Sequence, residues 1–124
     1  MSKDITINVG GTVIEAELGD GPTAQKVWDA LPIEARGNTW GDEIYFSIPV
    51  QAGEEPGAVP EVDEGDLAYW PPGPAFCIFF GPTPASAGDE PRAASAVSRF
   101  GRITGDATLL RSTPSSVKVR VEKA

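Results

Sequence analysis

Short segments that alternate apolar and polar residues, divided by glycine and proline, constrain the fold of this chain more than any other feature. The clearest are 5–9 and 117–121, where every second residue is isoleucine or valine. A period of two is typical of a β-strand with one buried face. Gly10 and Gly11 supply the positive φ angles of a tight turn, so residues 5–18 are predicted to form a β-hairpin.

A clear helical period appears once. Apolar residues follow Pro22 at the i, i+3, i+4 and i+7 spacing of one helix face, so residues 22–31 are predicted to form an amphipathic helix that ends before Pro32. A single helical turn is predicted at 93–97. Further strands are predicted at 33–36, 40–50, 66–70, 75–80 and 99–103.

The remaining segments indicate how these elements assemble. Residues 51–66 combine proline, glycine and six carboxylates without the spacing of an EF-hand, which predicts an exposed loop rather than a metal site. Seven or eight short strands with one marked helix and no repeated strand–helix–strand pattern predict an antiparallel sheet. Such a sheet must protect its edges, and a small closed barrel does so. We expect one domain, residues 1–124.

Absent and rare residue types exclude several kinds of chemistry. The chain has no histidine, which excludes an imidazole base, a histidine-ligated metal and a histidine pH switch. Its one cysteine, Cys77, cannot form an intramolecular disulfide, and an apolar strand around it predicts a buried, unreactive thiol. The glycines form no phosphate-binding motif. No cofactor and no metal is therefore expected.

Charge is distributed unevenly along the chain. The net charge is −8, but residues 1–90 carry 16 acidic and 3 basic side chains, whereas residues 91–124 carry 2 acidic and 7 basic ones. Net acidity argues against nucleic acid and anionic membranes as partners. We expect the C-terminal arginines Arg92, Arg99, Arg102 and Arg111 to pair with the acidic part of the fold or to stay solvated; the alternative is a local basic patch. Without a leader-like or membrane-spanning apolar run, a cytoplasmic location is expected.

The order of the predicted elements matches a known family. The segments 12–18 and 22–31, and Phe-Gly-Arg-Ile-Thr-Gly at 100–105 followed by 117–121, resemble the opening and closing parts of the cyclophilins. Three blocks, at 39–46, 65–73 and 77–84, resemble more specifically the short, atypical prokaryotic cyclophilin-like proteins, whose function is unassigned. The resemblance implies a mostly β fold, a closed antiparallel eight-stranded barrel with one main α-helix and a short helical turn. It also implies a groove on the outer barrel surface.

The residues of the family's proline-isomerase groove do not carry over. A typical cyclophilin presents its groove arginine in a Phe-His-Arg-Ile-Ile-Pro-like strand, and the counterpart here, Tyr-Phe-Ser-Ile-Pro at 45–49, has Ser47 in that place. Serine offers neither the charge nor the reach with which a guanidinium polarises a prolyl amide. The groove histidine falls near Val97. No catalytic residue is therefore assigned, and the usual isomerase activity is not expected.

The most specific hypothesis about a functional site concerns Glu43. A carboxylate beside aromatic rings loses hydration, which raises its pKa and suits it to bind a cationic or hydrogen-bond-donating ligand, or to act as a general base. The alternative is a surface glutamate that pairs with Arg99 or Arg102. Strand alternation over 40–50 predicts two faces, one with Trp40, Ile44, Phe46 and Ile48 and the other with Glu43, Tyr45 and Ser47.

Two further segments contribute to the predicted groove. Either Tyr69 or Trp70 is expected to face outward, where a large ring suits prolyl, aromatic or cationic ligands. Thr83, beside Pro82, either donates its hydroxyl to a ligand or helps to form a rigid turn. The candidate ligand-binding residues are Trp40, Glu43, Tyr45, Ser47, Tyr69, Trp70, Phe79, Pro82 and Thr83.

These observations favour a binding module that holds a small molecule or a proline-containing peptide in an external barrel groove. Two alternatives remain. One is a weak or non-standard prolyl isomerase that binds the twisted amide without arginine. The other is an accessory protein-interaction domain, and a homodimer is compatible with each hypothesis.

Overall fold

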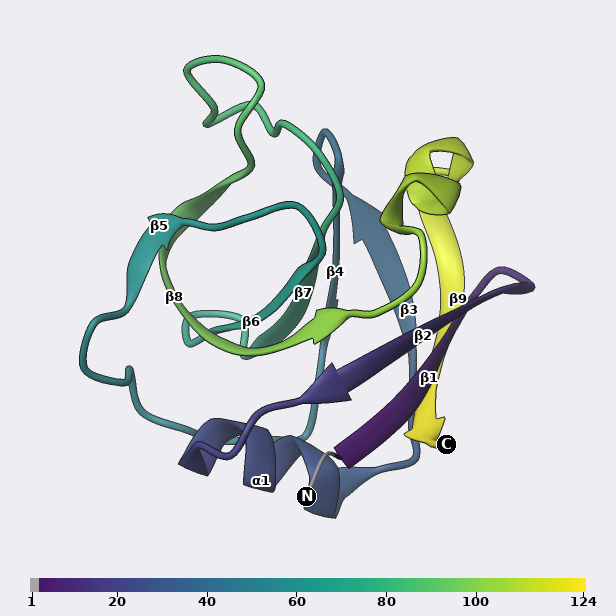
Figure 1. Ribbon diagram of the computed structural model, residues 1–124, viewed down its shortest axis with the longest axis vertical. Helices are drawn as coiled ribbons and strands as arrows, with labels where there is room; N and C mark the ends of the chain where they lie inside the picture. Colours follow the sequence, from purple (N-terminus) through teal and green to yellow (C-terminus); the bar gives the residue numbers. More distant parts are fainter. Residues whose placement is uncertain (1–2) are drawn as a thin grey trace.

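The strands of this chain close into a barrel, seen in Figure 1. The computed structural model describes residues 3–124. Within them the elements are β1 (Lys3–Val9), β2 (Thr12–Leu18), α1 (Pro22–Ala30), β3 (Ile33–Thr39), β4 (Glu43–Ser47), β5 (Val59–Glu61), β6 (Asp66–Trp70), β7 (Ala75–Phe79), β8 (Arg92–Ile103), the 3-10 helix η1 (Ala107–Ser112) and β9 (Ser116–Lys123).

Eight of the nine strands in residues 3–124 form the ring, in the order β2-β1-β9-β3-β4-β7-β6-β8, and a pairing of β2 with β8 closes it. Neighbouring strands are antiparallel throughout. The predicted hairpin is confirmed as β1 and β2, with Gly10 at φ 57° and Gly11 at φ 100° in its turn. The predicted closed antiparallel eight-stranded barrel, with one main α-helix and a short helical turn, is also confirmed.

The barrel interior is filled by the apolar residues of the alternating strands. Three phenylalanines meet there: the rings of Phe46 and Phe76 stack with centroids 4.8 Å apart, and Phe100 meets Phe76 edge-on at 5.0 Å. The helix α1 lies at the lower end of the barrel in Figure 1, where Val27 is fully buried in the same core. Burial of each such side chain stabilises the fold by about 1.5–3 kcal/mol.

Strand β8 bends away from the barrel in its first half. A register shift opposite Leu67 and Ala68 inserts one extra residue, Phe100, into β8, and such a bulge bends the strand that carries it. Before the bulge, β8 pairs with β5, which stands outside the ring in Figure 1. This outer layer covers part of β6 and β7. It forms a second apolar cluster of Val62, Ala68, Ala75, Cys77, Phe79, Ala93 and Val97.

Several element boundaries differ from those predicted. The helical turn predicted at 93–97 is wrong, because that segment is the first half of β8 and its backbone pairs with β5. The short helical turn is instead η1, where the side chain of Asp106 accepts a hydrogen bond from the Thr108 amide. The segment 51–66 contains β5, so it is not wholly a loop. Strand β3 runs to Thr39, and β4 begins only at Glu43, since a turn lies between them.

The predicted pairing between C-terminal arginines and the acidic part of the chain is confirmed for several pairs. Arg92 lies 3.2 Å from Glu61, Arg99 lies 3.5 Å from Asp66, and Arg111 lies 3.9 Å from Glu64. Within residues 3–124, Arg102 forms no such pair. Most of these side chains are exposed, so the pairs contribute little to stability. Neither helix within residues 3–124 has the length and apolar character needed to span a bilayer.

Candidate functional site

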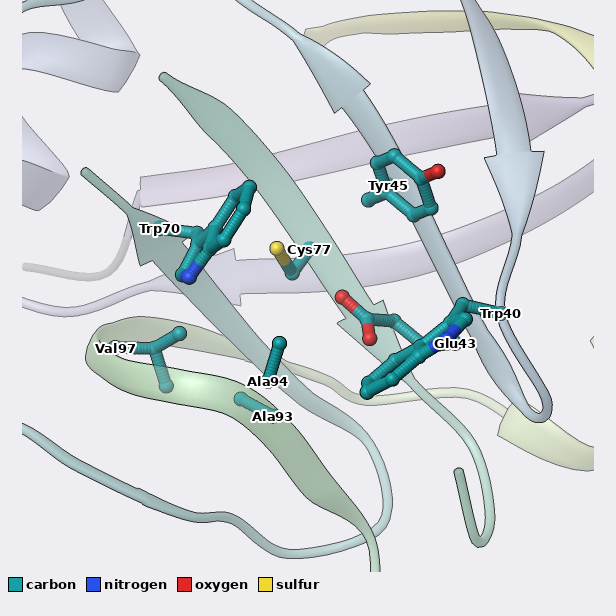
Figure 2. Close-up of a pocket in the computed structure, with 8 residues that line it drawn as sticks. All are labelled: Trp40, Glu43, Tyr45, Trp70, Cys77, Ala93, Ala94 and Val97. Carbon is teal, nitrogen blue, oxygen red and sulfur yellow. The ribbon is translucent and has the colours of Figure 1, made fainter. Parts of the chain in front are cut away.

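A pocket of about 300 Å³ lies on the outer wall of the barrel, between strands β4, β7 and β6 and the bent first half of β8. Its size is at the lower end of the range for ligand-binding pockets. Figure 2 shows the side chains around it. The lining residues are Trp40, Glu43, Tyr45, Trp70, Cys77, Ala93, Ala94 and Val97.

Strand register brings Glu43 to this pocket. Ile44 and Phe46 fill the barrel, so the alternating residues Glu43 and Tyr45 face the outside of β4. In β7, Cys77 pairs directly with Tyr45 and faces the same way. Glu43 is only 5% exposed, and Figure 2 shows its carboxylate directed into the space near Cys77 and Ala94.

Trp40 reaches the pocket through a turn rather than through strand alternation. The Trp40 amide donates a 2.9 Å hydrogen bond to the Glu43 carbonyl, and Gly41 between them has φ 62°. The prediction that Trp40 shares a face with Ile44 is therefore wrong, because β4 begins after Trp40 and alternation does not extend through the turn. The indole lies beside Glu43 (Figure 2).

The turn that carries Trp40 is held against the loop after β7. The Asp42 amide donates to the Pro82 carbonyl at 2.8 Å, and the Phe80 amide donates to the Asp42 carbonyl at 2.9 Å. A Cβ atom at Gly41 would lie 2.8 Å from Cα of Thr83, so only glycine fits at that contact. These contacts thus hold the backbone from which the Trp40 and Glu43 side chains extend.

Trp70 connects the opposite wall of the pocket, the first half of β8, to strand β6. Its indole Nε1–H donates a 2.7 Å hydrogen bond to the Ser95 hydroxyl, which ties the end of β6 to the outer half of β8. Of the two predicted aromatic residues, Trp70 is therefore the one that faces outward. Tyr69 points into the barrel, is 1% exposed, and donates its hydroxyl to the Val50 carbonyl at 2.9 Å.

Burial dominates the electrostatics of Glu43. Loss of hydration raises the pKa of its carboxyl from 4.5 to about 7, and a hydrogen bond from the Cys77 thiol offsets this rise only in part. Burial, with the neighbouring Glu43 charge, also raises the pKa of Cys77 well above its usual value. The thiol is buried, as predicted.

No arginine pairs with Glu43 among the residues that the structure describes. The alternative prediction, that Arg99 or Arg102 pairs with it, is wrong. The two arginines lie on either side of the bulge in β8: Arg102 is the register partner of Asp66, and Arg99, one residue before the bulge, lies 3.5 Å from the Asp66 carboxylate. Glu43 is left with the thiol as its side-chain partner.

The pocket does not include the other predicted site residues. Ser47 is exposed on β4 beyond the pocket, and Phe79 is fully buried in the second apolar cluster. Pro82 is exposed and contributes only its carbonyl to the turn. The Thr83 hydroxyl donates to the Arg92 carbonyl and accepts from the Ala85 amide, so it stabilises its own loop.

Sequence reasoning missed three residues of the pocket wall, Ala93, Ala94 and Val97. They lie in the segment mistaken for a helical turn, and their small side chains carry no chemical signal. Cys77 was also not assigned to the site. Its strand parity, opposite to that of Phe76, was the available signal.

A buried carboxylate in an apolar, aromatic pocket can accept hydrogen bonds or bind a positive charge. Within residues 3–124 the structure contains no group of three or more cysteine or acidic side chains arranged to hold a metal. Among the described residues, Glu43 is the one charged side chain that lines this pocket.

Comparisons with known proteins agree with this architecture. The sequence model of the cyclophilin-like family matches residues 3–122. The solution structure of the hypothetical protein AF2241 from Archaeoglobus fulgidus is similar, with 39% sequence identity, a TM-score of 0.82, and coverage of 99% of this chain and 95% of that one. No curated protein matches. Since the family match spans nearly the whole chain, the protein belongs to the cyclophilin-like family.

Proposed function

We propose that this cyclophilin-like domain is a binding module whose outer pocket holds a small molecule or the side chain of a proline-containing peptide. The observation that carries the proposal is the burial of the Glu43 carboxylate in an apolar pocket without a charged partner. Buried charges in proteins are normally paired, because desolvation of an isolated charge opposes folding. A ligand that binds this carboxylate would offset the cost of its desolvation.

The walls of the pocket support a binding role. Trp40, Tyr45 and Trp70 present large rigid rings, which contribute contact area with little loss of conformational entropy. The hydrogen bond to Ser95 holds the Trp70 ring in place, and the contacts of the Gly41 turn hold the backbone that carries Trp40. Preorganised walls reduce the entropy lost on binding.

The same geometry argues against turnover by the usual isomerase arrangement. Ser47, which replaces the family's groove arginine, is exposed outside the pocket. Arg92 and Arg99, on the nearby strand β8, are directed to acidic partners. Without a guanidinium near the pocket, the group that would stabilise a twisted prolyl amide is missing. Binding without catalysis is therefore the simpler assignment.

The three tryptophans of the chain provide a direct test by NMR. The indole N–H signals of Trp40 and Trp70 report on the pocket, whereas Trp28 lies on α1 and serves as an internal control. A panel of small aromatic, aliphatic and prolyl fragments should shift the first two signals and leave the third unchanged. The variant Ala94→Leu, which fills the pocket, should abolish the shifts, and Ala87→Leu, on an exposed loop, should not.

Two results would overturn the proposal. One is that no fragment at millimolar concentration moves the Trp40 or Trp70 signals. The other is that Ala94→Leu leaves the shifts intact. A protease-coupled assay on a proline peptide separates binding from turnover, because acceleration by micromolar protein would replace the binding role with isomerase activity.

A further inference from the structure

We infer that the ligand of this pocket is a small organic cation, a protonated amine with a compact apolar body, whose N–H groups bind the Glu43 carboxylate. The inference rests on the proposed function, because it names the class of ligand for the same pocket. It follows from three features of the site: an unpaired buried carboxylate, aromatic faces around it, and walls that offer an anion no basic partner.

First, the Glu43 carboxylate has no positively charged partner among the described residues that line the pocket. Glu43 is more than nine-tenths buried and points into the pocket (Figure 2). It is the one charged side chain that lines this pocket within the described part of the chain. The thiol of Cys77 donates one weak hydrogen bond, whereas a carboxylate can accept about four. The remaining acceptor capacity and the negative charge are both available to a ligand.

The second step is the arrangement of the rings. Trp40 lies beside the carboxylate, Tyr45 on one side of it, and Trp70 across the pocket (Figure 2). Aromatic faces attract cations, and the attraction is stronger where water is excluded. The indole N–H of Trp70 is already bonded to Ser95, so this ring offers a ligand its face rather than its donor. A carboxylate with flanking rings suits an ammonium group.

The third step is the rest of the wall. Ala93, Ala94 and Val97 of β8 contribute apolar contact, so the ligand needs a compact apolar body as well as one charged nitrogen. An anionic ligand would meet the Glu43 charge with no basic side chain to bind it. The net charge of −8 also favours the approach of cations. A highly hydroxylated ligand would leave its polar groups unpaired against these walls.

Binding of an ammonium group to the carboxylate must also displace the proton that Glu43 holds near neutral pH. The titratable groups that face Glu43 are Cys77 from β7 and Tyr45 from β4, while the β6 and β8 residues of the pocket carry none. Glu43 has a pKa of about 7 in the free protein. The ionised fraction therefore falls about 30-fold from pH 8.5 to pH 5.5, and the affinity for an amine should fall with it.

The experiment compares three probes of similar shape: 2-phenylethylamine as the cation, 2-phenylethanol as its neutral counterpart, and phenylacetate as the anion. Each is titrated into the full chain at pH 8.5 and pH 5.5, with the indole signals of Trp40 and Trp70 as the readout. The amine should bind at least about tenfold more tightly than the alcohol at pH 8.5, as expected of a charge-assisted hydrogen bond. This preference should disappear in Glu43→Gln and persist in Glu54→Gln, a matched change at an exposed carboxylate.

Several results of these titrations would overturn the inference. Equal binding of amine and alcohol, preference for phenylacetate, or an unchanged preference in Glu43→Gln would overturn the inference. The pH comparison on the unaltered chain tests it without any variant, and an amine affinity that does not fall at pH 5.5 would also refute it. If none of the three probes binds while other fragments shift the pocket signals, the inference fails and the binding role stands. If nothing shifts them, the proposed function itself fails.

Discussion

Replacement of Glu43 by glutamine should make the protein more stable at alkaline pH and change it little at acidic pH. The carboxyl has a pKa of about 7 in the folded chain against 4.5 when hydrated. Below about pH 4.5 both states hold the proton, and the stability associated with neutral Glu43 is fully present. As the pH rises towards 7, only the folded state keeps the proton, so this stability is lost.

The size of the loss follows from the two pKa values. A tenfold difference in proton affinity corresponds to 1.36 kcal/mol, so Glu43 should lower the free energy of unfolding by about 1 kcal/mol at pH 5 and about 3 kcal/mol at pH 8. Glutamine has the same shape, stays neutral and can still accept the hydrogen bond of the Cys77 thiol. The stability difference between variant and parent should therefore grow by about 2 kcal/mol from pH 5 to pH 8.

Urea unfolding at a series of pH values measures this difference, because all other titrating groups are common to the two proteins and cancel. The midpoint should shift with the slope m unchanged. The variant Glu54→Gln, at an exposed carboxylate, controls for the loss of one negative charge and should follow the parent at every pH. Parallel curves for Glu43→Gln and the parent, within about 0.5 kcal/mol, would refute the assignment of a desolvated, unpaired carboxylate.

Two substitutions and one labelling experiment test further features of the pocket. Gly41→Ala should lower the free energy of unfolding in urea by at least about 2 kcal/mol, because Gly41 has φ 62° and an added Cβ would lie 2.8 Å from Cα of Thr83. The control Gly53→Ala, where an added Cβ meets no atom within 4 Å, should change stability little. Trp70→Phe removes the hydrogen bond to Ser95 and should lower the free energy of unfolding by about 1 kcal/mol. Amide hydrogen exchange in residues 93–97 should become faster, and unchanged exchange would contradict the role of Trp70 in holding β8. Cys77 should resist a thiol reagent at pH 8 until urea unfolds the chain, and rapid native labelling would contradict its raised pKa.

Local patterns were sufficient to predict the barrel because most of its strands have one buried and one exposed face. In β1 and β9 the alternation of apolar and polar residues is strict, and the structure follows it. The first half of β8 behaves differently. Its alanines and serine have no clear period, and its strand conformation depends on pairing with β5, some thirty residues earlier in the sequence. Such long-range pairing is not visible in a local window.

The orientation of the side chains around the pocket could be predicted within β4 but not outside it. The faces of Glu43 and Tyr45 followed from alternation around Ile44, since these residues lie within one strand. Trp40 lies in the preceding turn, where alternation has no meaning, so its predicted face was wrong although it does line the pocket. Tyr69 and Trp70 are adjacent, and only the tertiary contacts of the barrel decide which ring is inside.

The proposed ligand class and the predicted instability at alkaline pH have one physical origin. Ile44 and Phe46, the apolar neighbours of Glu43 in β4, are buried without the desolvation of a charge, and an apolar residue at position 43 would be too. Glu43 instead leaves a negative charge that no described side chain neutralises. An ammonium ligand would neutralise the Glu43 carboxylate, so binding would offset the desolvation cost of this charge. Such a ligand should therefore stabilise the fold most at the pH where the unliganded protein is least stable.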